Sequence, residues 1–200
     1  MSDVCKEDWD HEFNRQDKFQ IERRDRYLIP FYKIRYAFEG RYVFMEKFNE
    51  NGKRSVIETQ YDTVVQQRHG FEYIEEKISS WSDKIGKRDL FMLETDSCTN
   101  PGHKSLGWMH NTKPHKLLYA FEMKEGGLDI YVIDFQKLKD WFWPIHTKYD
   151  VWEQPGFNRT QCRKVPINDV VGIIPTTHYI INADLKIHQL PCMTRKAIKA

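Results

Sequence analysis

The sequence lacks any long apolar run. None of its segments approaches the roughly 18 consecutive apolar residues that a membrane-spanning helix needs. Residues 1–26 mix acidic and basic side chains without the apolar stretch of a secretory signal peptide. The few cysteines are far apart and form no C-x-x-C pair: Cys5, Cys98, Cys162 and Cys192. These absences favour a soluble protein with free thiols in a reducing cytoplasm and no membrane partner.

An excess of charge of one sign is also lacking. The 31 Lys and Arg residues nearly balance 29 Asp and Glu residues, for a net charge of +2. No overall basic field therefore marks a nucleic-acid-binding protein, although the acidic metal ligands of a nuclease would offset basic contact residues. The sequence contains no glycine-rich phosphate loop and no G-x-S-x-G motif. It thus supports neither a P-loop nucleotide site nor catalysis by a serine hydrolase triad.

Apolar and aromatic side chains are plentiful, at 40% and 14% of the residues, which indicates a packed globular protein. A length of 200 residues suits one domain. The patterns predict hairpins within residues 61–78 and 117–133, a covered central strand at residues 90–94, and a helix at residues 136–143 that Pro144 stops. We therefore expect an α/β or α+β domain with a mixed central sheet of about five strands, flanked by helices.

Three regions are expected along the chain. Residues 1–26 would form a charged N-terminal arm, residues 27–174 the single domain, and residues 175–200 a C-terminal extension. Residues 27–48 alternate aromatic and basic side chains. They predict either a helix broken near Pro30 or a pair of strands that turns at Glu39-Gly40.

The first hairpin carries the most specific chemical pattern. Asp62 lies on its first strand and Glu75-x-Lys77 on its second. Side chains two residues apart in a strand share one face, so Glu75 and Lys77 point the same way.

The turn of this hairpin decides whether Asp62 joins them. With Arg68-His69 as a two-residue turn, Asp62 lies opposite Glu75. With His69-Gly70 as the turn, it lies opposite Lys77. A three-residue loop would instead place Asp62 opposite a residue of the other face and separate the three side chains.

Grouped in this way, the three side chains suit metal-dependent phosphodiester hydrolysis. Two carboxylates about 5 Å apart repel each other unless a cation lies between them. Mg²⁺ binds through one or two carboxylates and keeps several waters, which leaves room for a phosphate oxygen. A bound ion polarises the phosphoryl group and lowers the pKa of a water, while Lys77 can orient that water or stabilise the developing charge.

The tripeptide by itself carries little weight. Roughly three D/E-x-K matches are expected by chance in this composition, and matches occur at residues 75–77, 122–124 and 184–186. Only the first follows an acid-bearing strand across a short turn and precedes an apolar strand. The competing interpretation is an exposed ion network between the two strands.

The order of Asp62, hairpin, Glu75-x-Lys77 and apolar strand resembles the PD-(D/E)XK nuclease superfamily. The continuation resembles phage or mobile-element members of that superfamily, and the resemblance covers roughly residues 58–142. Tyr61 replaces the proline that precedes the first acid in the family. Further features of the resemblance are Gly107-Trp108, residues 118–121, residues 131–134 and Leu138-x-x-Trp141.

This resemblance implies a restriction-endonuclease-like fold and a nuclease that uses Mg²⁺ or Mn²⁺ to cleave DNA inside a bacterial host. Asp62 and Glu75 would be metal ligands and Lys77 the catalytic lysine. Glu94, at the end of the apolar strand, would extend the metal shell or simply meet solvent or a lysine. Some members use an additional acid on an N-terminal helix. The candidates for it in this sequence are Glu39, Glu46 and Glu58.

Three lysines in and beside the segment of residues 95–115 suit phosphate contacts, namely Lys104, Lys113 and Lys116. The alternative interpretation is that these lysines belong to a loop exposed to solvent and contact no phosphate. For the whole chain, the second hypothesis is a catalytically inactive protein with the nuclease fold. It would bind nucleic acid or a protein, for example as a phage-encoded modulator of a host factor. A homodimer is compatible with either hypothesis.

Overall fold

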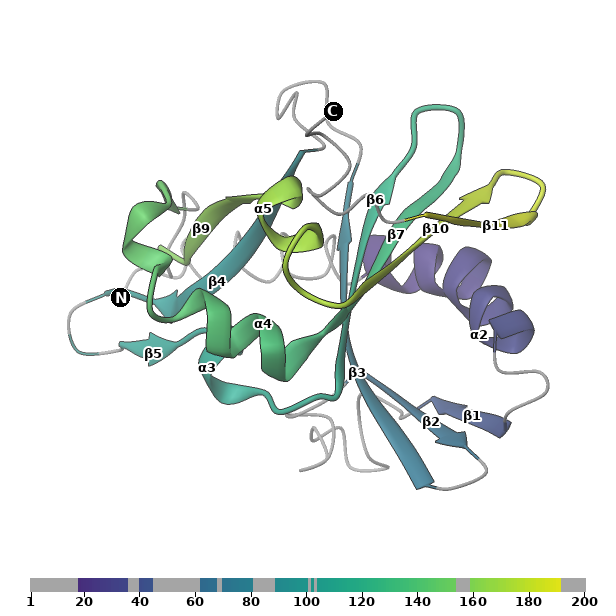
Figure 1. Cartoon of the computed structure of the whole chain (residues 1–200), viewed down its shortest axis with the longest axis horizontal. Coiled ribbons are helices and arrows are strands. Elements are labelled where there is room, and N and C mark those ends of the chain that lie inside the picture. Colours follow the sequence, from purple (N-terminus) through teal and green to yellow (C-terminus); the bar gives the residue numbers. More distant parts are fainter. Residues whose placement is uncertain are drawn as a thin grey trace, which may run out of the picture.

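The strands of the chain form two sheets. The computed structural model describes residues 18–35, 40–44, 62–67, 70–80, 89–100, 102, 104–153 and 159–191. In these residues the larger sheet has seven strands in the order β1-β2-β3-β6-β7-β10-β11, and the smaller sheet has four in the order β5-β4-β9-β8 (Figure 1). The larger sheet comprises β1 (Gly40–Phe44), β2 (Thr63–Gln67), β3 (Gly70–Ser79), β6 (Lys116–Glu122), β7 (Gly127–Asp134), β10 (Thr176–Asn182) and β11 (Ile187–Leu190). The smaller sheet comprises β4 (Leu90–Cys98), β5 (Ser105–Leu106), β8 (Val151–Glu153) and β9 (Gln161–Pro166).

The larger sheet is mixed because β3 and β6 run parallel, whereas its other described pairs are antiparallel. Parallel neighbours need a long connection. Here that connection contains β4, β5 and the short helix α3 (Trp108–Asn111). Part of the smaller sheet is therefore built inside the crossover from β3 to β6.

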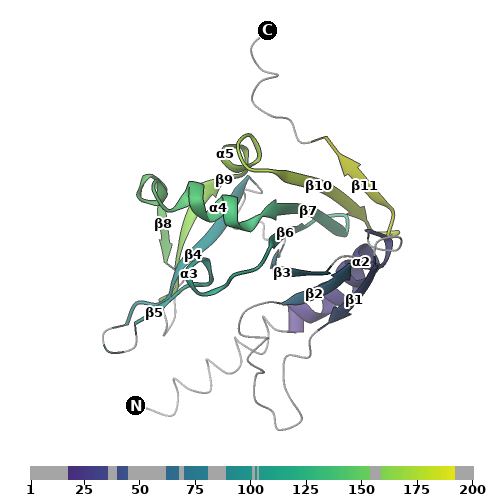
Figure 2. The same ribbon diagram turned by 60° about the horizontal axis from the view of Figure 1, so that its bottom comes forward.

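A helix over residues 18–35 covers one face of the larger sheet (Figure 2). It contains a π-helical turn, η1 (Arg24–Leu28), followed by α2 (Ile29–Arg35). Pro30 lacks an N–H and its ring would crowd the carbonyl four residues earlier in a regular α-helix, and a wider π turn relieves that crowding. The structure thus agrees with a helix that is interrupted near Pro30.

Each face of the larger sheet has its own core, and β6 contributes to both by the alternation of its side chains. One core joins the N-terminal helix to the sheet. The other lies between the larger sheet, the smaller sheet, α4 (Phe135–Phe142) and α5 (Ile167–Val171). The first includes Tyr27, Leu28, Phe31, Tyr32, Leu118 and Ala120. The second includes Phe91, Leu93, Leu117, Tyr119, Leu138, Phe142 and Val165.

Helix α4 begins and ends within one residue of the predicted bounds, residues 136–143. The side chain of Asp134 accepts a hydrogen bond from the backbone N–H of Lys137 and caps the first turn, and Trp143 caps the end just before Pro144. A short 3₁₀ turn, η2 (His146–Lys148), follows. None of the helices in the described part of the chain has the length and apolar character to cross a membrane.

The predicted class, an α+β domain with a mixed sheet flanked by helices, is confirmed. The expected number of about five strands is too low. A strand is present at the predicted residues 90–94, as part of β4, but its predicted position in the central sheet is wrong. It lies between β5 and β9 in the smaller sheet. Its burial alternates, with Phe91 and Leu93 fully buried and Met92 half-buried, so it is not covered equally on both faces.

The expected boundaries at residues 26 and 174 both fall inside packed structure. Residues 18–26 belong to the helix that covers the larger sheet, and residues 1–17 lie outside the described residues. Residues 176–182 form β10, which pairs with β7 along its whole length. The described parts of the expected arm and extension are therefore integral to the sheet and its covering helix.

The turn between β6 and β7 gives a test of the packing. Gly127 has a φ of +101°, and a Cβ there would lie 2.1 Å from the carbonyl oxygen of Ile181 on β10. Gly126 has a similar φ of +84°, but its nearest neighbour would be 3.4 Å away. We expect Gly126→Ala to cost about 1 kcal/mol for the strained backbone. Gly127→Ala should cost at least twice that in urea unfolding, because β10 must also move. Equal losses would contradict the close approach of β10.

Candidate active site

The register of β2 and β3 places Asp62 opposite Glu75. Thr63 pairs with Ile74, and the backbone N–H of Asp62 donates to the carbonyl of Ile74 at 3.0 Å. Asp62 precedes Thr63 and Glu75 follows Ile74, so the same register sets Asp62 opposite Glu75. This is the register predicted for a two-residue turn at Arg68-His69, and it is confirmed, although the two turn residues lie outside the described residues.

Glu75 and Lys77 point toward the core that faces the smaller sheet. In the parallel register of β3 and β6 they lie beside Leu117 and Tyr119, whose side chains belong to that core. Glu75 is only 5% exposed. The Nζ of Lys77 lies 2.5 Å from Oε1 of Glu75, and the Lys77 side chain remains 31% exposed, so this ion pair lies at the rim of the core.

Asp62 completes the group. Its side chain is half-buried, and its Oδ2 accepts a hydrogen bond from the backbone N–H of Glu76 at 2.7 Å. Its negative charge acts on both Glu75 and Lys77. The structure therefore brings together the three residues that the sequence predicts as catalytic.

Burial and charge set the protonation of this group. Burial raises the pKa of Glu75 to about 7, with the charge of Asp62 adding to the rise and Lys77 opposing it. Burial alone would lower the pKa of Lys77, but the carboxylates of Glu75, Asp62 and Glu94 outweigh burial and raise it. Lys77 thus stays charged, while Glu75 changes its protonation near neutral pH.

Glu94 approaches the group from β4 of the smaller sheet. Its Oε1 accepts from the hydroxyl of Ser97 at 2.5 Å and from the backbone N–H of Trp108 at 3.4 Å. Its charge contributes to the raised pKa of Lys77. Glu94 also faces Cys162, a free buried thiol whose pKa is raised to about 12 by burial and by this carboxylate. Glu94 is therefore near enough for its charge to act on Lys77, but among the described residues it is not grouped with Asp62 and Glu75 as a third metal ligand.

Gly107-Trp108 has a role at the site that its sequence pattern does not specify. A Cβ on Gly107 would lie 2.5 Å from the carbonyl oxygen of Glu94, so only glycine permits this close approach of α3 to β4. Trp108 then places its ring 5.2 Å from Nζ of Lys77, a cation–π contact. The pair forms part of the family resemblance, but nothing in its spacing predicts that it touches Lys77.

Behind the site lies a second buried acid that the sequence analysis overlooked. Glu76 points to the opposite face of β3, toward the N-terminal helix, and is 8% exposed. Its carboxylate accepts from the hydroxyls of Tyr32 at 2.8 Å and Thr63 at 2.5 Å. The Arg24 Nε lies 3.2 Å from its Oε2. Two adjacent acids in a strand face opposite ways, so one of them needs a buried basic partner when both faces of the strand are covered, as they are here.

Arg24 links this buried acid to Asp62. Its guanidinium donates to the backbone carbonyl of Asp62 and to the hydroxyl of Thr63, each at 2.7 Å. Burial raises the pKa of Glu76, and Arg24 opposes that rise. The N-terminal helix therefore holds the first residue of the candidate site in position through one arginine.

The three predicted phosphate-contacting lysines do not all gather in one place. Lys113 and Lys116 line a common cavity, in which Lys116 lies 3.8 Å from the carboxylate of Asp134. Lys104 is exposed and does not line it. The candidates for an additional helical acid lie outside the described residues, as does Tyr61.

The side chains of the site fit a hard divalent cation better than zinc. In the part of the chain that the structure describes, no three His, Cys, Asp or Glu side chains are grouped closely enough to hold a metal ion. A closed tetrahedral zinc site therefore has no counterpart there. Two carboxylates suit Mg²⁺ or Mn²⁺, which need only one or two such ligands and keep several waters. The proton that burial favours on Glu75 would have to leave before a cation binds.

Comparison of the chain with protein-family models, curated proteins and solved structures finds no match. The resemblance to the PD-(D/E)XK superfamily therefore stays a prediction from the sequence.

The raised pKa of Glu75 predicts how stability depends on pH. Between pH 4.5 and about 7 the folded protein holds a proton on Glu75 that the unfolded chain has lost, so stability should fall as pH rises through this window. Glu75→Gln cannot lose a proton. Relative to wild type it should gain on the order of 2 kcal/mol between pH 5 and pH 8. Urea unfolding at several pH values measures this, with Glu125→Gln in the exposed β6–β7 turn as the control. A constant difference across pH would contradict the buried position of Glu75.

Two neighbouring arginines test the buried pair behind the site. Arg24→Ala leaves Glu76 buried without its cation and should cost roughly 3 kcal/mol or more. Arg23→Ala removes a more exposed pair with Glu122, at 2.7 Å, and should cost no more than about 1 kcal/mol. Adding Glu76→Gln to Arg24→Ala should recover part of the loss. Chemical denaturation compares these variants, and similar losses for the two arginines would show that Arg24 is not the partner of Glu76.

Proposed function

We propose that this chain is a metal-dependent nuclease that hydrolyses phosphodiester bonds in DNA. The observation that supports it most directly is the convergence of Asp62, Glu75 and Lys77 at the rim of a buried core. An exposed ion network, the competing interpretation, does not require a carboxylate that is 5% exposed. Keeping Glu75 ionised in that position is unfavourable without a cation, and a divalent ion would supply more charge than Lys77 does.

In this proposal each side chain has a distinct task. Asp62 and Glu75 hold Mg²⁺ or Mn²⁺, and Glu94 faces the same space from β4. When bound, the ion polarises the phosphoryl group and lowers the pKa of a water. In the hydrolysis, a water oxygen would form a bond to phosphorus while the bond from phosphorus to one ester oxygen breaks. The attacking water would lose a proton to solvent, and the released ester oxygen would take one from solvent.

Lys77 would leave Glu75 to orient the water or to donate to the phosphate oxygens as negative charge develops there. Its raised pKa keeps it a cation throughout the physiological range. Trp108, with its ring 5.2 Å from Nζ, limits the directions in which the ammonium can move. The setting that the resemblance implies is the cytoplasm of a bacterial host, with the protein encoded by a phage or a mobile element.

The ion pair between Lys77 and Glu75 favours a second candidate function, a binding module without catalysis. Lys77 already neutralises Glu75 at 2.5 Å, and a third acidic ligand is not grouped with the other two among the described residues. A protein that keeps this pair permanently closed would be a binding module without catalysis, for nucleic acid or for a protein partner. In that case divalent cations should leave the thermal stability of the protein unchanged.

Substitution of Asp62 and of Lys77 tests the proposed nuclease activity. Asp62→Asn keeps an acceptor for the N–H of Glu76, and Lys77→Met keeps the length of the side chain. Each should lower the cleavage rate by at least roughly 100-fold, because each removes charge at the reacting group. The assay uses labelled duplex, branched and single-stranded DNA with Mg²⁺ or Mn²⁺.

The control for this assay is Lys137→Ala, an exposed position of α4, which should cleave like wild type. Circular dichroism establishes that each variant is folded. Wild-type rates in both Asp62→Asn and Lys77→Met would show that the site does not carry out the reaction.

A further inference from the structure

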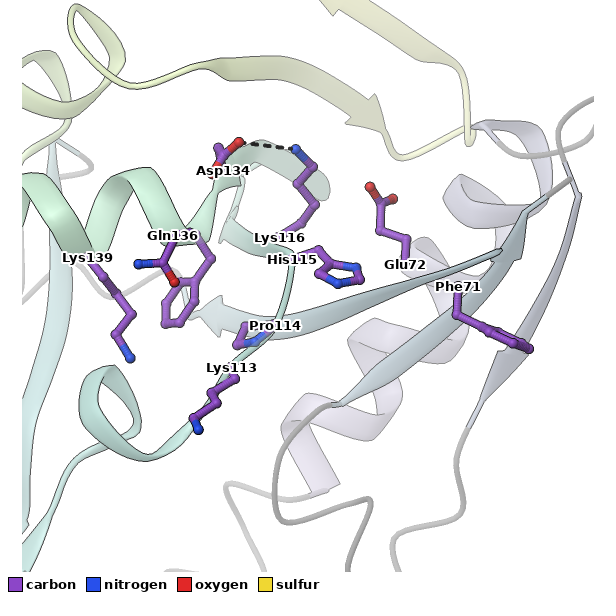
Figure 3. Close-up of a pocket in the computed structure, with 10 residues that line it drawn as sticks. Phe71, Glu72, Lys113, Pro114, His115, Lys116, Asp134, Gln136 and Lys139 are labelled. Atoms are coloured by element: carbon purple, nitrogen blue, oxygen red, sulfur yellow. Dashed lines mark ion pairs between the residues drawn. The ribbon is translucent and has the colours of Figure 1, made fainter. Parts of the chain in front are cut away.

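A cavity of about 600 Å³ opens between the start of β3, the segment that leads into β6, and helix α4 (Figure 3). Its size lies within the range of small-molecule sites in proteins. Ten residues line it: Phe71, Glu72, Lys113, Pro114, His115, Lys116, Asp134, Phe135, Gln136 and Lys139. Two of its lysines, Lys113 and Lys116, are predicted from the sequence to contact phosphate, whereas the cavity and Lys139 are not.

Two cations of this cavity lie on one side of it. Lys113 and Lys139 project in the same direction from different elements (Figure 3). Burial lowers the pKa of Lys139, and the neighbouring charge of Lys113 lowers it further. The Nζ of Lys139 is 3.3 Å from the carbonyl oxygen of Thr112 and 3.4 Å from that of His110. Two like charges that line one cavity and act on each other favour an anion between them.

The acids of the cavity indicate that its ligand is more than an anion. Asp134 uses one oxygen to cap α4 and the other to approach Lys116 at 3.8 Å. Glu72 lies on the same side of the view as Lys116 (Figure 3). A free phosphate gains nothing from carboxylates. A nucleotide, in contrast, presents amino and imino donors as well as a phosphate.

Aromatic rings complete the lining. Phe71 is 54% exposed, a large apolar side chain without a covering element among the described residues. His115 is exposed and its ring lies 5.1 Å from that of Tyr73. Exposed rings beside lysines are the usual means by which proteins hold unpaired bases, with stacking on the ring and contacts from cations to the phosphates.

The cavity is joined to the candidate active site by two stacked rings. Phe135 lines the cavity and stacks on Trp108 at 6.1 Å, and Trp108 in turn lies over Lys77. Nζ of Lys139 lies 5.4 Å above the Phe135 ring. Two ring contacts, from Phe135 to Trp108 and from Trp108 to Lys77, therefore connect the lining of the cavity with the candidate site.

We propose that this cavity holds an unpaired nucleotide of the strand that is cleaved at Asp62, Glu75 and Lys77. This inference rests on the proposed nuclease function and specifies its substrate class: DNA with unpaired nucleotides beside the cleavage position, such as a single strand or a flap. Lys113 and Lys139 contact the phosphate, and Phe71 and His115 stack on the base.

Binding measured in EDTA tests the lysines without any cleavage. The probe is a 5′-fluorescein-labelled 15-nucleotide single strand, followed by fluorescence anisotropy. Lys113→Ala combined with Lys139→Ala should weaken binding by about tenfold and reduce the salt slope by about 1.4, for two lost phosphate contacts on a single strand. The control is Lys137→Ala, which removes an exposed lysine of α4 outside the cavity. It should change the affinity and the salt slope only as much as the loss of one distant surface charge does.

A second pair of variants tests the base. Phe71→Ala should weaken binding of the single strand by about fivefold to tenfold and leave binding of a duplex of equal length nearly unchanged. Ile173→Ala is the control, since Ile173 is 56% exposed and does not line the cavity. An abasic site placed at each position of the single strand in turn should locate the base that stacks on Phe71. At that position the abasic site weakens binding by wild type as much as Phe71→Ala does, and it causes no further loss of affinity in Phe71→Ala.

Three results would overturn the inference. They are unchanged binding in the double lysine variant, equal losses for single-stranded and duplex DNA with Phe71→Ala, and displacement of the single strand by polyglutamate at equal charge concentration, which would indicate an acidic protein ligand. Failure of the nuclease proposal is distinguishable, because cleavage by wild type and Lys77→Met is measured in a separate assay with Mg²⁺ or Mn²⁺, whereas this binding assay contains EDTA. Tight, Phe71-dependent binding by a protein that cleaves nothing would leave the cavity assignment in place and remove only the catalysis.

Discussion

The pairing register of β2 with β3 is the constraint on which the site depends. Since side chains alternate along a strand, this register decides that Asp62 lies opposite Glu75 and that Glu75 and Lys77 share a face. It also sends Glu76 to the opposite face, where Arg24 meets it. A shift by one residue would exchange the two faces, placing the lysine against the N-terminal helix and the buried acid in the candidate site.

The site is assembled from three layers, and no single element would suffice. The hairpin supplies the two acids and the lysine. The smaller sheet brings Glu94 to the same place, and the close approach at Gly107 lets Trp108 confine Lys77. The N-terminal helix holds Asp62 from behind through Arg24. Each contact crosses from one layer to another, so the geometry of the candidate site is a consequence of the packing of both cores.

Local patterns predicted the hairpins and helix α4 with its stop at Pro144, because these depend on alternation and turn residues close in the sequence. They limited the register of the first hairpin to a few alternatives, and only the structure selects the one with Arg68-His69 as the turn. The placement of β4 in a second sheet could not be predicted, since alternation shows that a strand exists but not which strand it joins. Strand β10 lies in the segment predicted as a C-terminal extension, and Thr176, Thr177 and His178 at its start interrupt the apolar pattern. Arg24 lies 52 residues before Glu76 in numbering, so only the folded chain pairs them. The role of Asp62, Glu75 and Lys77 in catalysis remains a prediction.

The central claim is that Asp62 and Glu75 bind a divalent cation that displaces Lys77 from Glu75. Crystals soaked in Mn²⁺ test it directly, with anomalous scattering to identify the ion. The account predicts a manganese peak between the carboxylates of Asp62 and Glu75, with the Lys77 ammonium withdrawn from Glu75, and no such peak in Asp62→Asn. Crystals in which Glu75 remains paired with Lys77 and no manganese is found between the two acids would contradict it.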